Sequence, residues 1–344
     1  MKRRDFLKAA AASTSLAGCT RAAKNEDLVK VPKVSAEQAR DRHQGRSAVA
    51  LIPCPSYQED MTGLLHQYAD RVGVPDLKGK NVVLKPNMVE YRKDMPIHTN
   101  PAVVKAVIEF VRDRGAASVT VAEGPGHMRD TEFLLQVMGI QDVLDEMNVP
   151  FVDLNLDDLD KVPNPHGFTS LEHFYLPATI TRADVVVSLP KLKTHHWVGV
   201  TCSMKNLFGT VPGRKYGWPK NLLHFKGIPK SIIDLVRIIK PAFAVVDAIV
   251  AMEGDGPING TPIDTGFLAM GRDLAALDAT CTRITSINPD ELSYLILAGK
   301  VIGNTDPAMI DLLGSDIDSL KRPFKQPITL TNKEMIARAA HEGS

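Results

Sequence analysis

Short apolar segments rich in β-branched residues recur along the chain, and a polar loop and a helical pattern follow each of them. Runs such as Val-Val-Leu at 82–84 and Val-Val-Val at 185–187 are continuous, which is typical of strands buried on both faces. The expected strands are residues 48–52, 81–85, 118–122, 151–154, 184–189, 243–247 and 265–270. Alternation of strands and helices predicts an α/β fold with a mostly parallel, doubly wound sheet and helices on both faces.

The clearest expected helix covers residues 101–114. Asn100 is a suitable N-cap, Pro101 occupies the first helical position, and Gly115 ends the helix. Further helices are expected at residues 59–72, 131–138, 229–239, 273–286 and 289–299. Residues 155–180 interrupt the alternation, and an antiparallel edge strand is expected at 171–180. The pattern predicts one large domain over residues 47–325, either undivided or in two lobes, and a C-terminal tail or helix at 326–344.

Ionisable residues gather in the loops that follow four of the expected strands, together with Gly or Pro. Ligands of open parallel sheets bind beyond the carboxyl ends of the strands, so these loops are the first place to look for a site. The loops are KPN at 85–87, EGPGH at 123–127, PKLKTHH at 190–196, and Asp247 with MEGDGP at 252–257. A short helix in SMKNLFG at 203–209 is expected to bring Lys205 and Asn206 to the same rim.

The residue types in these loops predict a site for a small anion, with a divalent metal as a second candidate ligand. Lysine side chains and glycine-rich turns bind carboxylate or phosphate, while carboxylates and histidines bind cations or move protons. The expected ligand-binding residues are Lys85, Asn87, Glu123, Gly124, Gly126, Lys191, Lys205 and Asn206. The expected catalytic residues are Lys193, His195 and Asp247. The candidate metal ligands are His195, His196, Glu253 and Asp255.

Each motif also has a purely structural interpretation. The EGPG and EGDG segments are common turn sequences, and Lys191 and Lys193 suit a solvated edge equally well. Adjacent His195 and His196 point to opposite sides if they lie in a strand, and they are then more simply a packed pair. The functional interpretation depends on the agreement of several loops. A scaffold protein would instead disperse Lys85, Glu123, Lys193 and Asp255 over more than about 15 Å, too far apart for one small-ligand pocket.

The N-terminus, MKRRDFLKAAAASTSLAGC, is typical of a signal peptide over residues 1–19. Arg3 and Arg4 match the twin-arginine export motif, and Leu16-Ala17-Gly18-Cys19 matches a lipobox in which Cys19 receives lipid. These features predict export by the twin-arginine machinery and a lipid anchor in the bacterial cell envelope, on the periplasmic or the outer-surface side. Residues 20–46 are polar and without periodicity, so they are expected to form a flexible tether.

Composition narrows the choice of partners. Removal of residues 1–18 leaves 37 Lys and Arg against 39 Asp and Glu, and this balance gives no basic field for nucleic acid. Besides Cys19 the chain has only Cys54, Cys202 and Cys281, none in a CxxC pair. No disulfide framework and no iron–sulfur cluster of its own are therefore expected.

Taken in order, the motifs resemble the bacterial and archaeal family named domain of unknown function 362. The segments that carry the resemblance are VLKPN at 83–87, TNPAVV at 99–104, AEGPG at 122–126, PKLKTH at 190–195, MKNLFG at 204–209 and MEGDGP at 252–257. Many members carry a cysteine-rich, ferredoxin-like tail, which this sequence does not show. A more distant similarity to nickel-pincer lactate racemases implies only that a cofactor can occupy such a cleft.

Two functions follow from this sequence. The first is an exported, lipid-anchored enzyme that acts on a small anionic substrate. Its lysines would hold the anion, with His195 as acid or base and Asp247, Glu253 and Asp255 as base or metal ligands. The alternative is a non-catalytic lipoprotein that binds a cofactor or metal and serves a redox partner. The substrate, the reaction and the cofactor stay open at this point.

Overall fold

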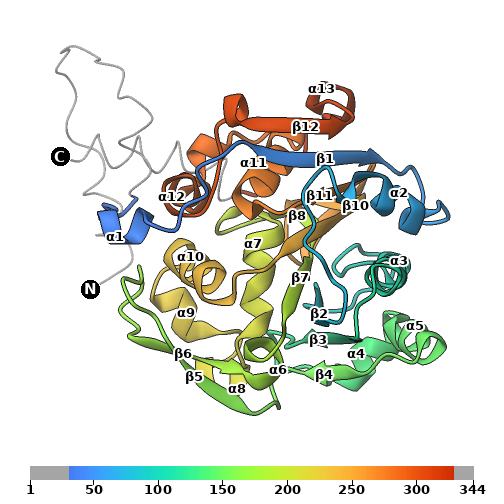
Figure 1. The fold of residues 1–344 in the computed structure, drawn as a ribbon, viewed down its shortest axis with the longest axis horizontal. Helices are drawn as coiled ribbons and strands as arrows, with labels where there is room; N and C mark the ends of the chain where they lie inside the picture. The colour runs from blue at the N-terminus through green and yellow to red at the C-terminus, as the bar shows by residue number, and fades with distance from the viewer. Residues whose placement is uncertain (1–30, 329–344) are drawn as a thin grey trace, which may run out of the picture. The chain divides into compact units, whose positions relative to one another are not determined.

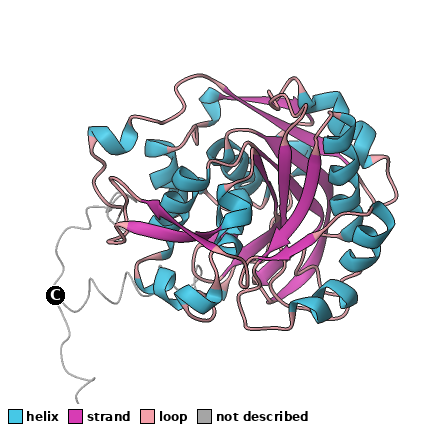
Figure 2. Ribbon diagram, turned by 60° about the horizontal axis from the view of Figure 1, so that its bottom comes forward, coloured by secondary structure: helices cyan, strands magenta, loops and turns pink. Residues whose placement is uncertain are grey.

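The computed structural model describes residues 31–328. Their main feature is a twisted sheet that lies between two layers of helices (Figures 1 and 2). The main sheet runs in the order β12-β1-β11-β10-β7-β2-β3-β4. Its strands are β1 (Ser47–Pro53), β2 (Asn81–Pro86), β3 (Ser118–Glu123), β4 (Phe151–Asp153), β7 (Val185–Leu189), β10 (Phe243–Asp255), β11 (Asn259–Gly271) and β12 (Ile310–Gly314). Two short strands, β8 (Lys191–His195) and β9 (Gly199–Thr201), extend the sheet beside β10.

All neighbours on the main path pair in parallel except β11, which is antiparallel to both β1 and β10. The predicted mostly parallel α/β fold is therefore confirmed. The strands differ from the prediction in three ways. β10 and β11 continue past the sheet as a long hairpin that contains the EGDG segment. PKLKTH, expected as a loop, forms strand β8, and β12 was not expected.

Strands in the centre of the sheet bury both faces, which explains their continuous apolar runs. In β1, Val49 and Leu51 belong to one hydrophobic cluster, while Ala50 and Ile52 belong to the other. β10 and β11 alternate in the same way. Since successive side chains of a strand point to opposite faces, both clusters depend on the same strands. Each face therefore needs a layer of helices, as a doubly wound fold provides.

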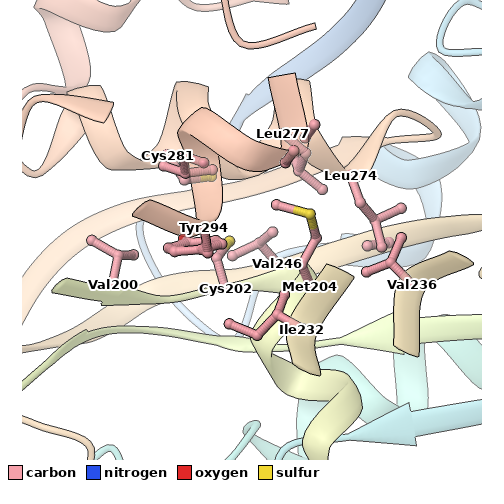
Figure 3. Close-up of a cluster of buried hydrophobic side chains, with 14 of the residues drawn as sticks. Val200, Cys202, Met204, Ile232, Val236, Val246, Leu274, Leu277, Cys281 and Tyr294 are labelled. Atoms are coloured by element: carbon pink, nitrogen blue, oxygen red, sulfur yellow. The ribbon is translucent and has the colours of Figure 1, made fainter. Parts of the chain in front are cut away.

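The helices of one layer pack on the first face, and Figure 3 shows the buried side chains beneath them, including Met204 and Tyr294. These helices are α7 (Ser203–Asn206), α10 (Ile228–Ile239), α11 (Leu274–Ile284) and α12 (Ser293–Val301). The second layer contains α2 (Met61–Ala69), α3 (Pro101–Asp113), α4 (Thr131–Val137) and α5 (Ile140–Met147). Asn100 caps α3 by accepting a hydrogen bond from the Ala102 N–H, with Pro101 in the first turn, as predicted. α5 was not predicted.

Short elements complete the unit. They are α1 (Ala36–Ala39), α6 (Ala178–Thr181), the 3-10 turn η2 (Leu207–Thr210), α8 (Gly213–Tyr216), α9 (Asn221–Phe225), the 3-10 turns η3 (Pro289–Glu291) and η4 (Pro307–Met309), and α13 (Ile317–Leu320). The edge strand expected at 171–180 is instead β6 (His173–Pro177), which pairs with β5 (Leu159–Pro163) in a separate two-stranded sheet. Phe174 and Leu176 of β6 face the core, so this hairpin covers the first helical layer.

The N-terminal boundary of the folded unit lies earlier than expected. Of the predicted tether, residues 31–46 are attached to the domain: Ser35 caps α1, and the Arg42 guanidinium donates to the carbonyl of Gly299 at 2.7 Å. The signal peptide, the lipobox Cys19 and residues 329–344 lie outside the described residues. Within residues 31–328 no helix is both long and apolar enough to cross a membrane.

Candidate functional site

The strand order reverses direction between β2 and β7. From β2 the chain continues to β3 and β4 on one side, and from β7 it continues to β10 on the other. Such a switch point opens a crevice at the carboxyl ends of the strands, where open α/β sheets bind ligands. A cavity of about 330 Å³ lies here, lined by side chains from the ends of β2 and β3, from β8 and α7, and from the tip of the β10–β11 hairpin.

Most of the predicted site residues line this one cavity. They are Lys85, Asn87, Glu123, Gly124, Gly126, Lys193, His195, His196, Lys205, Asn206 and Asp255. A scaffold protein was expected to disperse four of these residues over its surface. All four line the same small cavity: Lys85, Glu123, Lys193 and Asp255. The structure does not support a dispersed polar rim.

A chain of hydrogen bonds joins four segments across the switch point. The Lys193 amine donates to Asn87 Oδ1 at 2.6 Å, and Asn87 Nδ2 donates to Asn206 Oδ1 at 3.2 Å. The same Asn206 oxygen accepts from the Lys85 amine at 3.0 Å, and Lys85 also donates to Glu123. Each asparagine accepts on one side and donates on the other. This explains the asparagines of KPN and MKN, which carry no charge and nevertheless fix the lysines.

The lysines of the cavity differ in how many acceptors they have. Lys85 donates to Pro86 O, Glu123 and Asn206, which matches the three N–H bonds of an ammonium. Lys193 donates to Asn87 Oδ1 and to Ile97 O at 2.7 Å, so its two acceptors match a neutral amine. Lys205 is half-buried, and within residues 31–328 its amine has no hydrogen bond or ion pair, only the Phe208 ring 3.8 Å away. The cavity therefore contains an amine, that of Lys205, that forms no hydrogen bond or ion pair with a described group.

Burial acts on all these groups. Burial and the charges of three neighbouring lysines hold the pKa of Lys193 well below its ordinary value. Burial, followed by the charge of Lys85, lowers the pKa of Lys205 to about 7. Burial lowers the pKa of Lys85 and raises that of Glu123, and the attraction between the two charges opposes both shifts. An anion in the cavity would reverse the shifts of Lys193 and Lys205, because it stabilises their charged forms.

His195 is held in one tautomer. Its Nδ1 accepts the Trp197 N–H at 3.1 Å, which places the proton of a neutral ring on Nε2. Burial and then the charge of Lys205 keep the pKa of His195 well below its usual value, so the ring stays neutral at pH 7. His195 therefore lines the cavity as a hydrogen-bond donor.

An aromatic wall surrounds one side of the cavity. The rings of His195 and His196 stack with centroids 5.0 Å apart, so the end of β8 turns the second histidine back toward the first. Trp197 contacts His196 edge-on at 4.5 Å and His224 at 5.1 Å, and His224 contacts Phe208 at 5.8 Å. We call His195, His196, Trp197, Phe208 and His224 the aromatic wall.

Position 209 requires a glycine because its backbone lies against the side chains of Glu123 and Lys85. A Cβ at this position would lie 1.9 Å from Glu123 Oε1 and 2.6 Å from Lys85 Nζ. The backbone of η2 therefore presses on the Lys85–Glu123 pair, and the Gly209 carbonyl accepts from the Gly124 N–H at 3.1 Å. The glycine of MKNLFG, which suggests only a helix end in the sequence, shapes the floor of the cavity.

A buried carboxylate from a neighbouring helix of the same layer fixes the short helix that carries Lys205. Asp278 of α11 accepts from the backbone N–H of Ser203 at 2.8 Å and of Met204 at 3.1 Å. It thereby caps the first turn of α7, a helix too short to be stable on its own. Lys205 thus projects from an anchored turn.

Three predicted site residues lie outside this cavity. Lys191 and Asp247 form a buried ion pair at 2.8 Å, and Tyr57 completes the cluster by donating to Asp247 and accepting from Lys191. Neither the ligand-binding role of Lys191 nor the catalytic role of Asp247 matches this placement, because their polar atoms are already used. Glu253 binds the C-terminal segment through Lys325, at 3.0 Å.

The candidate metal ligands do not form a common set. Among the residues that the structure describes, no group of three or more His, Cys, Asp or Glu side chains can hold a metal ion. His195 and His196 stack on each other, Glu253 holds Lys325, and Asp255 accepts from the Ile328 N–H.

Sequence analysis did not identify Lys220 as a cavity residue. Its amine donates to Asn155 Oδ1 at 2.9 Å and to the Val211 carbonyl, and burial lowers its pKa to about 7. It follows an irregular segment, in a left-handed conformation with φ of 68°. No local pattern marks it, because its place in the cavity depends on contacts far along the chain.

Comparison with known proteins places the chain in a family. The family model described as "Domain of unknown function (DUF362)" matches residues 82–283, more than half of the chain. This range contains most of the cavity residues. It also contains the cap of α7.

Individual relatives are more distant. The Thylakoid-associated protein sll1697 of Synechocystis sp. is 31% identical over 227 residues, which are 61% of this chain and 64% of that protein. The chain thus spans less than two thirds of this curated relative. The lactate racemase apoprotein of Thermoanaerobacterium thermosaccharolyticum has a TM-score of 0.46 at 16% identity, covering 75% of this chain and 62% of that one. A structural-genomics target from Thermotoga maritima has a TM-score of 0.34 at 13% identity, over 62% and 55% of the two chains.

Proposed function

The chain belongs to the DUF362 family, and we propose that it is an enzyme that binds a small organic anion in the cavity at the switch point. One observation carries this proposal. Lys85, Lys193, Lys205 and Lys220 line a cavity of about 330 Å³ in which Glu123 is the one buried carboxylate among the described residues. Buried lysines are normally paired, so the surplus of amines calls for an anionic ligand.

The size and lining of the cavity support a small ligand with a carboxylate or phosphate group. Its volume lies at the lower end of the range of about 300–1,000 Å³ that is usual for ligand pockets. Lysine amines and Asn206 offer polar contacts, and the aromatic wall offers apolar ones. The amines of Lys193 and Lys205, with their lowered pKa values, can move protons on the bound ligand, and neutral His195 can donate a hydrogen bond to it.

Titration calorimetry with pyruvate, succinate and inorganic phosphate tests this function. At pH 6.5 we expect at least one of the three to bind, with one site per chain, and to raise the melting temperature. Lys193→Met should abolish this binding, whereas the exposed Lys161→Met of β5 should bind normally. Failure of all three anions to bind, or equal binding by both variants, would contradict an anion site in this cavity.

We also propose that the domain is exported by the twin-arginine route and held at the cell envelope by lipid on Cys19. The order of twin arginines, apolar stretch and lipobox supports this placement, and a relative carries the name thylakoid-associated protein. The test is fractionation of cells that express the native chain or Cys19→Ala. We expect the native chain in the membrane fraction and the variant outside it. Equal membrane association of both would contradict the anchor.

A further inference from the structure

One amine in the cavity has no structural task among the described residues. Lys205 is half-buried, and residues 31–328 offer its Nζ no carboxylate and no carbonyl. The centre of the Phe208 ring lies 3.8 Å from Nζ, a cation–π contact when the amine is charged. The helix that carries it is nevertheless fixed by Asp278. An amine that has no partner contributes little to stability. Its position on a firmly held turn therefore points to a functional role.

The surroundings of Lys205 favour a reactive neutral amine. Burial lowers the pKa of Lys205 most, and the charge of Lys85, whose three donors are all satisfied, lowers it further, while the charge of Glu123 opposes both. The resulting pKa of about 7 leaves about half of the Lys205 amines neutral at pH 7. A lysine that is desolvated and placed next to another cation is the usual arrangement for forming a Schiff base with a carbonyl compound.

We propose that Lys205 is a covalent catalytic residue that forms an imine with a 2-oxo acid bound in the cavity. This inference rests on the proposed anion site, because Lys193 and Lys220 would hold the carboxylate of the oxo acid. Lys193 has two acceptors for its amine, so a third N–H is free for the ligand when the amine is protonated. Lys220 likewise has two.

The step is balanced without an oxidant or a metal. The Lys205 nitrogen attacks the carbonyl carbon, a C–N bond forms, and the π electrons move to oxygen, which takes a proton. The nitrogen of the resulting carbinolamine loses its extra proton. The hydroxyl then leaves as water after a second protonation, and a protonated imine remains. The net change is one carbonyl compound, one neutral amine and one proton from solvent converted to one protonated imine and one water.

His195 is the group placed to donate a hydrogen bond to the oxygen. Its Nδ1 is occupied by the Trp197 N–H, so Nε2 carries the proton of the neutral ring. Lys205 and His195 line the same cavity, and the charge of Lys205 acts on the ring. The ring can thus donate a hydrogen bond to the negative charge that develops on oxygen, in the state that dominates at neutral pH. The protons that nitrogen releases and oxygen gains exchange with solvent water.

Reductive trapping tests the imine directly. The full chain is incubated with pyruvate, 2-oxoglutarate or phenylpyruvate and sodium cyanoborohydride, which converts an imine to a stable secondary amine. We expect one adduct per chain in the intact mass, and peptide mapping should place it on Lys205. Lys205→Arg keeps the charge without a nucleophile, and Lys205→Met removes both. Both should give no adduct above background, whereas Lys161→Met should react as the wild type does.

Binding measured without reductant separates this inference from the anion site. If oxo acids bind by calorimetry and Lys205 carries no adduct, or if the adduct maps to another lysine, the imine proposal is wrong and the anion site stands. If no anion binds and no adduct forms, both proposals are wrong. Circular dichroism of the two Lys205 variants shows that they are folded. If only Lys205→Met unfolds, Lys205→Arg still decides the matter.

Discussion

Lys191 and Lys193 are two residues apart on the same short strand, and both are buried, yet they belong to different kinds of site. Lys191 faces Asp247 at 2.8 Å and Tyr57 at 2.7 Å. Lys193 meets only neutral oxygens, those of Asn87 and Ile97. The first lysine is neutralised within the fold. The second lies beside further amines and has no carboxylate partner among the described residues.

The partners of a buried lysine therefore distinguish these two kinds of site. The Lys191–Asp247 pair bridges β8 and β10, and Asp247 also accepts from the Asn100 N–H at the start of α3. It therefore connects the sheet to a helix layer. In the cavity, by contrast, the amines of Lys85, Lys193, Lys205 and Lys220 line one shared volume. Removing a partner should destabilise the fold in the first region and change ligand binding in the second.

The largest expected effect is that of Asp247→Asn. The substitution keeps the shape but leaves Lys191 buried without a carboxylate, and breaking a buried pair costs about 3–5 kcal/mol. Urea unfolding should show this loss in the free energy of unfolding. Lys205→Met should lose less than about 0.5 kcal/mol, because its amine has no partner to abandon. Similar losses in both variants would mean that the two regions do not differ in kind.

Much of the fold was predictable because continuous apolar runs and helix caps are local signals. The predicted mostly parallel α/β sheet and the N-cap of α3 are confirmed. Strand β8 was missed because its residues Lys-Leu-Lys-Thr-His are mostly polar, and polarity favours a loop. They are buried only because β10 and β9 cover them and buried partners satisfy their side chains.

The cavity was predictable in outline, because residues at the carboxyl ends of parallel strands meet at one edge. The sequence did not allow us to predict which of the lysines pairs with a carboxylate within the fold. Lys191 pairs with a residue 56 positions away, and Asp278 caps α7 across 75 positions. Lys220 enters from an irregular segment with no motif of its own. These contacts depend on the tertiary arrangement, and so single-sequence reasoning could not distinguish the structural lysine from the binding ones.

Gly209→Ala should have the next largest effect, and it sharpens the contrast by damaging the cavity alone. The new Cβ would overlap Glu123 Oε1, so the pair with Lys85 must shift. We expect a loss of about 1–3 kcal/mol, the usual cost of overpacking, together with loss of anion binding. Gly45→Ala, outside the cavity, is the matched control, since its Cβ would lie at an ordinary contact distance of 3.5 Å from the His43 ring. If Gly209→Ala binds anions as the wild type does, the Lys85–Glu123 pair does not shape the site.

The pH dependence of binding should show a smaller but specific effect. Lys205 and Lys220 have pKa values of about 7, and an anion in the cavity would raise both. Below pH 7 both amines are mostly charged, so their contribution to the affinity is at its maximum. Above pH 7 binding must take up protons, and the affinity should fall by up to about tenfold per pH unit for each proton.

Calorimetry with phosphate between pH 6 and pH 8.5 measures this linkage. Phosphate gains charge over the same range, so succinate serves as the reference anion above pH 6.5. Lys205→Arg stays protonated throughout and should reduce the slope, leaving the contribution of Lys220. An affinity for succinate that is unchanged from pH 7 to pH 8.5 would show that neither amine is neutral in the empty site.

Trp197→Ala should have the smallest effect and tests whether the aromatic wall belongs to the binding region. Trp197 is 53% exposed, so the free energy of unfolding should change by no more than about 0.5 kcal/mol. The affinity for phenylpyruvate should fall several-fold, since an aromatic contact contributes about 0.5–1.5 kcal/mol. Phe225→Ala, at an 85% exposed position of α9 away from the cavity, should change neither quantity. If both variants weaken binding equally, the wall is not specific to the ligand. If Trp197→Ala mainly destabilises the fold, the wall resembles the Lys191–Asp247 cluster more than the lysine cavity.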